Sequence, residues 1–368
     1  MNLAANGARL GRTRPSIGEN QMRRVAKLLG PGAVALLLVG LIAAPGASAA
    51  PLASISASSC NRASNIEAII DDSGSMEITD PNRLRVQAMN LLIDTLNPKT
   101  QLGAVEFGSG IDIPGIITEP PADTVFPPQP VGPNAAAMRS ALDSVVKADN
   151  GATDYNGAFA KSDADNPGAD ARIFLTDGGH DVGTYNEGHL THKVPTYVIG
   201  FGSGISSGED QARLKKIAKD TGGKYLVAQD TSQLQSAMNS IGAALTCQTP
   251  PRLFTDLLKQ GQSKLHSITV GAATKTLQIT LTWVSPLDKF KVNGLRLVGK
   301  GGLLAVASRT HRPPSKLKVT KTPSSTFTII KVSGLRKGTL RFNVKAAKIA
   351  SGAPKATLTT QVGQSTHK

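Results

Sequence analysis

Three oxygen-bearing side chains alternate in the segment 71–75, namely Asp71, Ser73 and Ser75. The apolar run 66–70 before them is typical of a buried strand, so the cluster stands at the carboxyl end of that strand. One carboxylate and two hydroxyls are ligands that a hard divalent cation prefers, and they neutralise its charge only in part. A cation held in this way can recruit a carboxylate from another molecule. The spacing therefore predicts metal-mediated recognition, provided that other segments supply the missing ligands.

Two later segments carry the same chemistry. Thr153 precedes a helical pattern that begins near Tyr155, and Asp177 leaves a strand-like run through Gly178. In an open parallel α/β sheet, ligands gather outside the carboxyl ends of the strands. We therefore expect Thr153 and Asp177 at the same sheet edge as the 71–75 cluster. Their neighbours Asp72 and Asp154 are expected to be solvated or to cap helices.

The elements that must position these residues alternate between strands and helices as far as Cys247. This alternation predicts an α/β fold, a doubly wound and mainly parallel sheet. Asp80-Pro81 is expected to start the first helix, and the proline-rich segment 119–133 is expected to be a loop before a helix at 135–147. The strand-like runs are 66–70, 101–107, 172–176 and 196–201, and later helical patterns cover 214–218 and 234–245.

The pattern changes at Pro250-Pro251. Leu277, Ile279 and Leu281 alternate with polar residues, and a second alternating run covers 340–346. This period of two predicts an all-β antiparallel sandwich over residues 252–363, with turns at 292–294 and 333–334.

The three segments with the candidate metal residues resemble the von Willebrand factor type A (vWA) domain, which carries a metal-ion-dependent adhesion site. The resemblance covers residues 60–247 and rests on an Asp-x-Ser-x-Ser motif followed by Met76, on Gly151-x-Thr153, and on Thr176-Asp177-Gly178. Segments 197–202 and 217–223 resemble a later strand and helix end of the family. The resemblance implies Mg²⁺ or Mn²⁺ as cofactor and a protein partner that supplies Asp or Glu. The implied metal residues are Asp71, Ser73, Ser75, Thr153 and Asp177, with the two aspartates acting largely through water. A vestigial site without metal remains an alternative.

Residues 1–49 are predicted to be a signal peptide. Basic residues precede the apolar run 32–44, which is too short to span a bilayer, and Ala47-Ser48-Ala49 is a good cleavage site. The prediction is a secreted protein without a stable transmembrane anchor, although a retained anchor remains an alternative. The chain start at Met1 is also open, because translation from Met22 would give a shorter leader.

The chain has two cysteines, Cys60 and Cys247, and an exported protein with two cysteines is expected to form one disulfide. The first strand runs toward the metal edge and the last helix runs away from it. Both cysteines, and the sandwich that follows them, are therefore expected at the opposite edge. Two free thiols are the alternative.

The net charge of +15 is divided unevenly. Residues 50–250 carry 14 Lys and Arg against 23 Asp and Glu, whereas residues 251–368 carry 21 against 2. A basic sandwich favours an anionic cell-surface polymer as target. Nucleic acid is not expected, because Trp283 lies on the inward phase and no aromatic platform remains for bases. A solubilising surface that blocks edge pairing is the alternative. The candidate polyanion-binding residues are Lys289, Lys291, Lys316, Lys318, Arg341 and Lys345.

No Ser/His/Asp, Cys/His or paired-carboxylate arrangement supports catalysis, so we predict a binding protein and not an enzyme. His180, His189 and His192 could be read as a zinc site, but a glycine-rich segment without cysteine favours exposed loop histidines. The leading hypothesis is a secreted adhesion protein. Its rivals are an accessory subunit that positions an extracellular hydrolase, and a self-associating structural module with an idle metal site.

Overall fold

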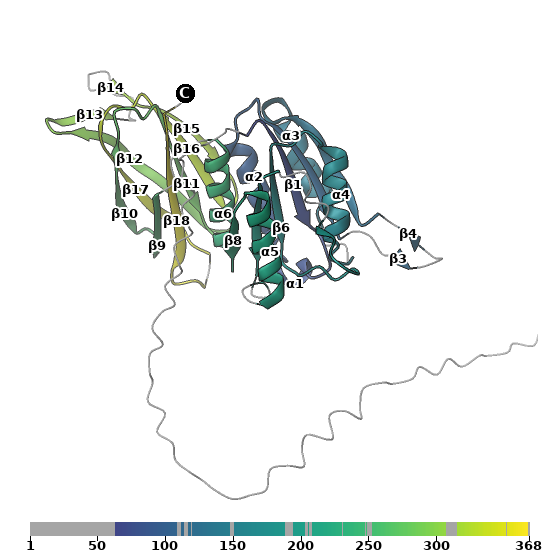
Figure 1. Cartoon of the computed structure of the whole chain (residues 1–368). Coiled ribbons are helices and arrows are strands. Elements are labelled where there is room, and N and C mark those ends of the chain that lie inside the picture. Colours follow the sequence, from purple (N-terminus) through teal and green to yellow (C-terminus); the bar gives the residue numbers. More distant parts are fainter. Residues whose placement is uncertain are drawn as a thin grey trace, which may run out of the picture. The chain divides into compact units, whose positions relative to one another are not determined.

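The computed structural model describes residues 63–366, with gaps at 109–111, 114–116, 119, 148–150, 188–193, 203–204, 206–207, 230, 247, 249–251, 307–314 and 351. The α/β part and the sandwich belong to one compact unit (Figure 1). The predicted signal peptide and both cysteines lie outside the described residues. Among the described helices, none combines the length and the apolar character needed to cross a membrane.

A six-stranded sheet in the order β5-β2-β1-β6-β7-β8 forms the centre of the α/β part. Five of its strands are parallel to their neighbours, and β5 runs antiparallel to β2 at one edge. The strands are β1 (Asn65–Asp71), β2 (Gln101–Phe107), β5 (Ala122–Pro130), β6 (Ala171–Thr176), β7 (Thr196–Phe201) and β8 (Tyr225–Ala228). The short strands β3 (Asp112–Ile113) and β4 (Ile117–Thr118) pair with each other, and they belong to the part of the chain that connects β2 to β5.

Helices cover both faces of this sheet, so the predicted doubly wound α/β fold is confirmed. One core contains Met89 of α2, Met138 of α3 and Met238 of α6. The core on the other face contains Phe159 of α4 and Leu214 of α5. The helices are α1 (Met76–Thr79), α2 (Leu84–Thr95), α3 (Val131–Val145), α4 (Tyr155–Asp165), α5 (Gly208–Thr221) and α6 (Thr231–Leu245).

Two local predictions in this part are wrong. The helix expected to begin at Pro81 begins at Leu84, because Arg83 takes a left-handed conformation with φ 51°. Asp80 still caps it, since its carboxylate accepts hydrogen bonds from the Leu84 and Arg85 amides at 2.6 and 2.9 Å. The proline-rich segment is not a loop but the edge strand β5. Prolines are tolerated there because an edge strand has one side without a hydrogen-bonding neighbour.

The second part is a β-sandwich, as predicted. Its outer sheet has the order β10-β17-β12-β13-β14, and its inner sheet has the order β15-β16-β11-β18-β9. All pairings are antiparallel except a short one between β13 and β14. The strands are β9 (Arg252–Leu258), β10 (Ser263–Val270), β11 (Thr276–Thr282), β12 (Lys289–Gly299), β13 (Gly302–Val306), β14 (Ser315–Lys316), β15 (Lys318–Pro323), β16 (Phe327–Ser333), β17 (Gly338–Lys348) and β18 (Ala356–Ser365).

The turn expected at 292–294 is instead a bulge inside β12. Gly294 has φ +63°, and the register with β17 shifts between Asn293 and Arg296. A glycine in this conformation can bend a strand without ending it. The bulge returns Arg296 to the solvent-facing side of the outer sheet, directly opposite Arg341.

The sandwich is not confined to the sheet edge opposite the metal segment, where it was expected. Instead its inner sheet packs along α2 and α6, and on α2 it reaches from Gln87 near the start to Asp94 near the end (Figure 1). Gln235 of α6 donates to the Thr326 hydroxyl at 2.8 Å, and Asn239 donates to the side-chain Oε1 of Gln361 at 2.7 Å. On α2, Leu91 forms an apolar cluster with Phe327 and Ile329. Because helices cover its outer side, β11 is buried on both faces.

The disulfide between Cys60 and Cys247 stays a prediction, and one contact beside it supports it. The Ala63 amide donates to the Leu245 carbonyl oxygen at 3.2 Å, which brings together the chain segments that lead to the two cysteines. We expect no thiol to react with a thiol reagent in the denatured, unreduced protein. Reduction should lower the free energy of unfolding by about 4–5 kcal/mol, because it releases a long closed loop. The Cys60→Ser/Cys247→Ser variant should match the reduced protein, and two reactive thiols without reductant would contradict the prediction.

Candidate metal centre

The 71–75 segment leaves the centre of the sheet, where β1 lies between β2 and β6. Asp71 is the last residue of β1 and is fully buried. Ser73 is buried as well, whereas Ser75 is exposed just before α1. Asp177 follows the end of β6, the strand next to β1, so the two carboxylates reach the same sheet edge. The carboxyl ends of β1 and β6 therefore lie at the same sheet edge, as the sequence predicts.

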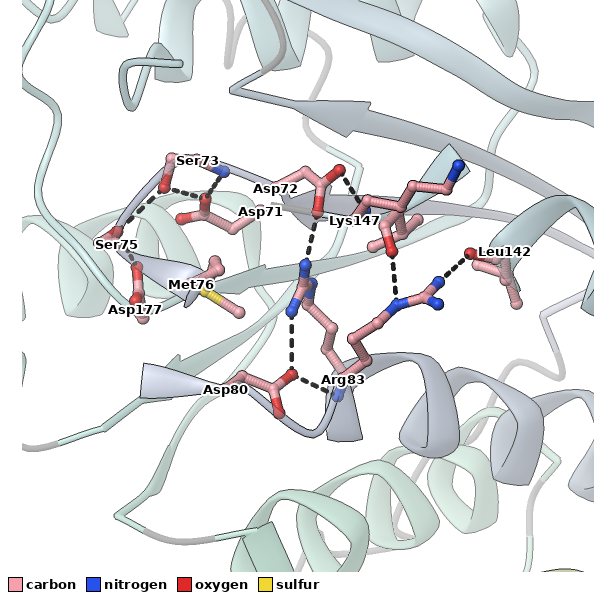
Figure 2. A network of polar contacts seen from close by, with 12 residues as sticks. Asp71, Asp72, Ser73, Ser75, Met76, Asp80, Arg83, Leu142, Lys147 and Asp177 are labelled. Carbon is pink, nitrogen blue, oxygen red and sulfur yellow. Dashed lines mark hydrogen bonds and ion pairs between the residues drawn. The ribbon is translucent and has the colours of Figure 1, made fainter. Parts of the chain in front are cut away.

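Four of the five predicted metal residues follow one another at hydrogen-bonding distances (Figure 2). The Ser73 hydroxyl donates to Asp71 Oδ1 at 2.5 Å and lies 3.1 Å from the Ser75 hydroxyl. The Ser75 hydroxyl donates to Asp177 Oδ1 at 2.8 Å. The Ser73 amide also donates to Asp71 Oδ1, at 2.9 Å. These contacts hold two carboxylates and two hydroxyls within a single small volume.

Thr153 joins the same volume through the glycine that follows Asp177. A Cβ placed on Gly178 would lie 3.6 Å from the Thr153 hydroxyl and 3.9 Å from the Ser75 hydroxyl, so both face the same space. The loop of Thr153 is fixed on two sides. Its amide donates to Asp181 Oδ1 at 2.7 Å, and the Gly74 amide donates to the Gly151 carbonyl at 3.1 Å. All five predicted residues therefore come together.

Two further hydroxyls belong to the cluster and were not predicted as part of it. Thr176 donates to Asp71 Oδ2 at 2.5 Å, and Thr79 of α1 donates to Asp177 Oδ2. Thr176 stands beside Asp177 in the quoted Thr-Asp-Gly segment, so its place at the strand end was a usable signal. Thr79 follows Ser75 by four residues, which is one helical turn.

The electrostatics of the cluster favour a cation. Burial raises the pKa of Asp71 to about 7, and the nearby Asp177 carboxylate adds to the rise. A divalent ion would supply the opposite charge that favours the ionised carboxylates. The donors are all oxygens, two carboxylates and three predicted hydroxyls, and this set fits a hard cation such as Mg²⁺ or Mn²⁺. Among the described residues no group of three or more His, Cys, Asp and Glu side chains could hold a metal, so the fit depends on the hydroxyls.

Asp72 is buried, and the expectation of a solvated side chain is wrong. Its carboxylate forms an ion pair with Arg85 at 2.5 Å and accepts a hydrogen bond from the Lys147 amide at 2.7 Å (Figure 2). Arg85 also pairs with Asp80 at 3.1 Å, and all three side chains are fully buried. Arg85 therefore compensates one carboxylate on the segment 71–75, which we call the metal loop, and one just before α2.

Arg83 attaches the start of α2 to the end of α3 (Figure 2). Its guanidinium donates to the carbonyl oxygens of Val146, Leu142 and Asp143 at 2.9, 3.0 and 2.8 Å. These are carbonyls at the end of a helix, where a cation is favoured. The residue after them, Lys147, is the one whose amide binds Asp72, so α2, α3 and the metal loop form one polar network.

Asp154 caps α4 as expected, because its carboxylate accepts from the Asn156 amide at 2.9 Å. His180 is not an exposed loop histidine. Its side chain is 1% exposed, and its Nδ1 accepts a hydrogen bond from the Tyr155 amide at 3.1 Å. His189 and His192 lie outside the described residues.

The predicted polyanion-binding residues divide between the two sheets of the sandwich. Lys289, Lys291, Arg341 and Lys345 are exposed on the outer sheet, whereas Lys318 is exposed on β15, the edge strand of the inner sheet. They do not form a single stripe. The side chain of Lys316 is outside the described part of the structure.

No family model and no curated protein matches the chain. Similar solved structures include a von Willebrand factor type A protein from Catenulispora acidiphila, with 17% identity, a TM-score of 0.41, and coverage of 82% of this chain and 63% of that one. Mussel byssus proximal thread matrix protein 1 with a zinc-occupied MIDAS motif has 19% identity, a TM-score of 0.38, and coverage of 55% and 50%. The pilus adhesin SpaC from Lactobacillus rhamnosus GG has 11% identity, a TM-score of 0.39, and coverage of 83% and 44%. The chain thus spans between 44% and 63% of the length of these three structures.

Replacement of Arg85 by leucine should destabilise the protein strongly, because Asp72 and Asp80 would stay buried without their shared cation. The expected loss in free energy of unfolding is about 3–5 kcal/mol, measured by urea denaturation. Arg139→Leu is the matched control, since Arg139 pairs with Asp94 at a partly exposed position. Its expected loss is about 0–1 kcal/mol. Equal losses in the two variants would contradict a special role for Arg85.

Proposed function

We propose that this chain is a secreted, vWA-type binding protein that recognises a partner's Asp or Glu through a divalent cation. The observation that carries the proposal is the gathering of Asp71, Ser73, Ser75, Thr153 and Asp177 at one edge of the sheet. Secretion is part of the proposal because of the apolar leader and the cleavage-type segment before residue 50.

The residues divide into two roles in this proposal. Ser73, Ser75 and Thr153 would bind the ion with neutral oxygens, and Asp71 and Asp177 would act largely through water and supply compensating charge. Neutral oxygens neutralise none of the ion's charge, so the ion keeps its attraction for a further carboxylate. The bound cation would supply Lewis acidity toward that carboxylate and no bond-breaking chemistry.

A protein partner fits the surroundings of the site. Ile78, one turn after Ser75 in α1, is 85% exposed, and Val182 in the loop after Asp177 is 41% exposed. Exposed apolar side chains beside a polar anchor are typical of protein interfaces, where a few buried contacts carry most of the binding energy. We infer a partner whose carboxylate has an apolar neighbour that packs against Ile78.

The charge division between the two parts keeps self-association as the second candidate function. An acidic α/β part, with 14 Lys and Arg against 23 Asp and Glu, could attract the basic sandwich of another copy. That contact would not use the metal, because both acids of the sandwich are buried and engaged. Asp256 lies 2.7 Å from His266 Nε2, and Asp288 accepts a hydrogen bond from the Ala350 amide. Self-association predicts oligomers that dissociate in salt and do not respond to chelator.

Metal binding should stabilise the folded protein. With Mg²⁺ or Mn²⁺ at a hundredfold excess over the dissociation constant, the free energy of unfolding should rise by about 2.7 kcal/mol relative to chelator. Thermal melting measures the shift. Asp71→Ala should abolish it, whereas Glu77→Ala should keep it, because Glu77 is an exposed acid next to the site and is not a ligand. No shift in the wild type, or an equal shift in Asp71→Ala, would contradict the proposal.

Peptide selection tests the carboxylate and its apolar neighbour. Random peptides displayed on phage and selected on the Mg²⁺-loaded protein should be enriched in Asp or Glu beside an aliphatic residue. Chelator should release them, and replacement of their acid by the amide should abolish binding. Ile78→Lys should weaken the peptides while leaving the metal-dependent melting shift in place. Selected peptides without a carboxylate would exclude this mode of recognition.

A further inference from the structure

Six cations project from the outer sheet of the sandwich on its solvent-facing side, and we call this surface the basic face. They come from the neighbouring strands β12 and β17 and are all exposed. The sequence pattern missed two of them, Arg296 and Lys348, because an extra residue in β12 and another in β17 bring these positions into register. The six residues are Lys289, Lys291, Arg296, Arg341, Lys345 and Lys348.

The six cations stand opposite one another in pairs. The register places Lys291 against Lys345, Arg296 against Arg341, and Lys289 against Lys348. Like charges directly opposite each other on one face destabilise a sheet. Three such pairs on one face are therefore unfavourable to the fold, and a bound anion would remove the repulsion.

The sandwich segment offers no acid that relieves this repulsion. Asp256 and Asp288 are the only acidic residues in the segment 251–368. Both are buried, at 8% and 4% exposure, and both are engaged within the sandwich. The residues of the basic face between the charged pairs are polar and neutral, namely Asn293 and Asn343.

Protection of a sheet edge does not explain the basic face. Lysines on an edge strand prevent pairing with another chain, and this accounts for Lys318 and Lys321 on β15. In contrast, Arg341 and Lys345 of β17 lie between β10 and β12, and Arg296 of β12 lies between β17 and β13. The backbone at these three positions has a strand neighbour on each side, so edge protection does not account for their charges.

The two sheets of the sandwich have different surroundings. The face of the inner sheet that points away from the sandwich core is covered by α2 and α6, through contacts such as Leu91 with Phe327. The outer sheet keeps its solvent side exposed at all six cations. The face with the uncompensated charge is therefore a face that remains accessible in the folded chain.

We propose that the basic face binds a linear phosphate polymer that carries no bases. From Arg341 to Lys348 the track is about 23 Å long at 3.3 Å per residue, so it spans several repeating units. Guanidinium pairs favour phosphate because their planar donors match its oxygens. The sandwich has no outward aromatic residue on β12 or β17, since Phe290 and Phe342 are buried, so there is no platform on which bases could stack. The proposal gives a chemical identity to the anionic target and does not depend on the metal.

Fluorescence anisotropy with labelled inorganic polyphosphate tests the proposal on the full chain in the presence of chelator. Lys291→Gln/Lys345→Gln should bind at least tenfold more weakly than the wild type. The slope of log affinity against log salt should fall by about 1.4, the value for two lost phosphate contacts on a single-stranded polyanion. The matched control is Lys318→Gln/Lys321→Gln, which removes the same charge from the inner sheet and should bind within about twofold of the wild type.

Three results would overturn the proposal. The first is an equal loss in both double variants, since it would indicate a response to net charge alone. The second is binding of single-stranded DNA or poly-glutamate at least as tight as that of polyphosphate. The third is a lower free energy of unfolding in Lys291→Gln/Lys345→Gln, because removal of a like-charge pair should leave stability unchanged or raise it. Asp71→Ala should bind polyphosphate normally, which separates this proposal from the metal site.

Discussion

The candidate site depends on two adjacent carboxylates at the end of β1 whose side chains point in opposite directions (Figure 2). Successive residues of an extended chain alternate in direction. Asp71 therefore turns toward Ser73 and Thr176, and Asp72 turns toward Arg85. Two buried negative charges next to each other would be costly without compensation. Arg85 compensates Asp72 from within the protein, whereas Asp71 accepts hydrogen bonds from the Ser73 and Thr176 hydroxyls and lies near a second carboxylate, that of Asp177.

The gathering of the candidate site residues could be predicted from the sequence because it follows from strand direction. Parallel strands bring their carboxyl ends to one edge, so Asp71 and Asp177 had to meet once the alternation of strands and helices was recognised. The partner of Asp72 could not be predicted in this way. A polar residue after a buried strand is consistent with a solvated loop, and its burial depends on Arg85, which arrives from a helix that begins only after the left-handed turn at Arg83.

The docking of the sandwich was mispredicted for a related reason. A period of two shows which side chains of a strand are apolar and which are polar. It does not show whether the polar side chains face water or pack against another element. Thr280 belongs to the polar phase of β11 and is 1% exposed, because its hydroxyl donates to Asn239 of α6 at 3.2 Å. The inner sheet thus contacts the helices through hydroxyls and amides. In the sequence these side chains look the same as those of a solvent-exposed surface. The bulge at Gly294 hid Arg296 from the same pattern, since it changes the phase in the middle of a strand.

Helix α2 connects the metal loop to the sandwich. Near its start, Arg85 is fixed to Asp72 by a buried ion pair. Along its side, Gln87 accepts a hydrogen bond from the Ser325 hydroxyl at 3.2 Å, and Leu91 packs against Phe327. A shift of this helix would break either the ion pair, which is expensive to separate inside the protein, or the interface with the inner sheet. The sandwich therefore does more than carry a basic face, because its docking on α2 helps to hold the loop that presents Asp71, Ser73 and Ser75 in one arrangement.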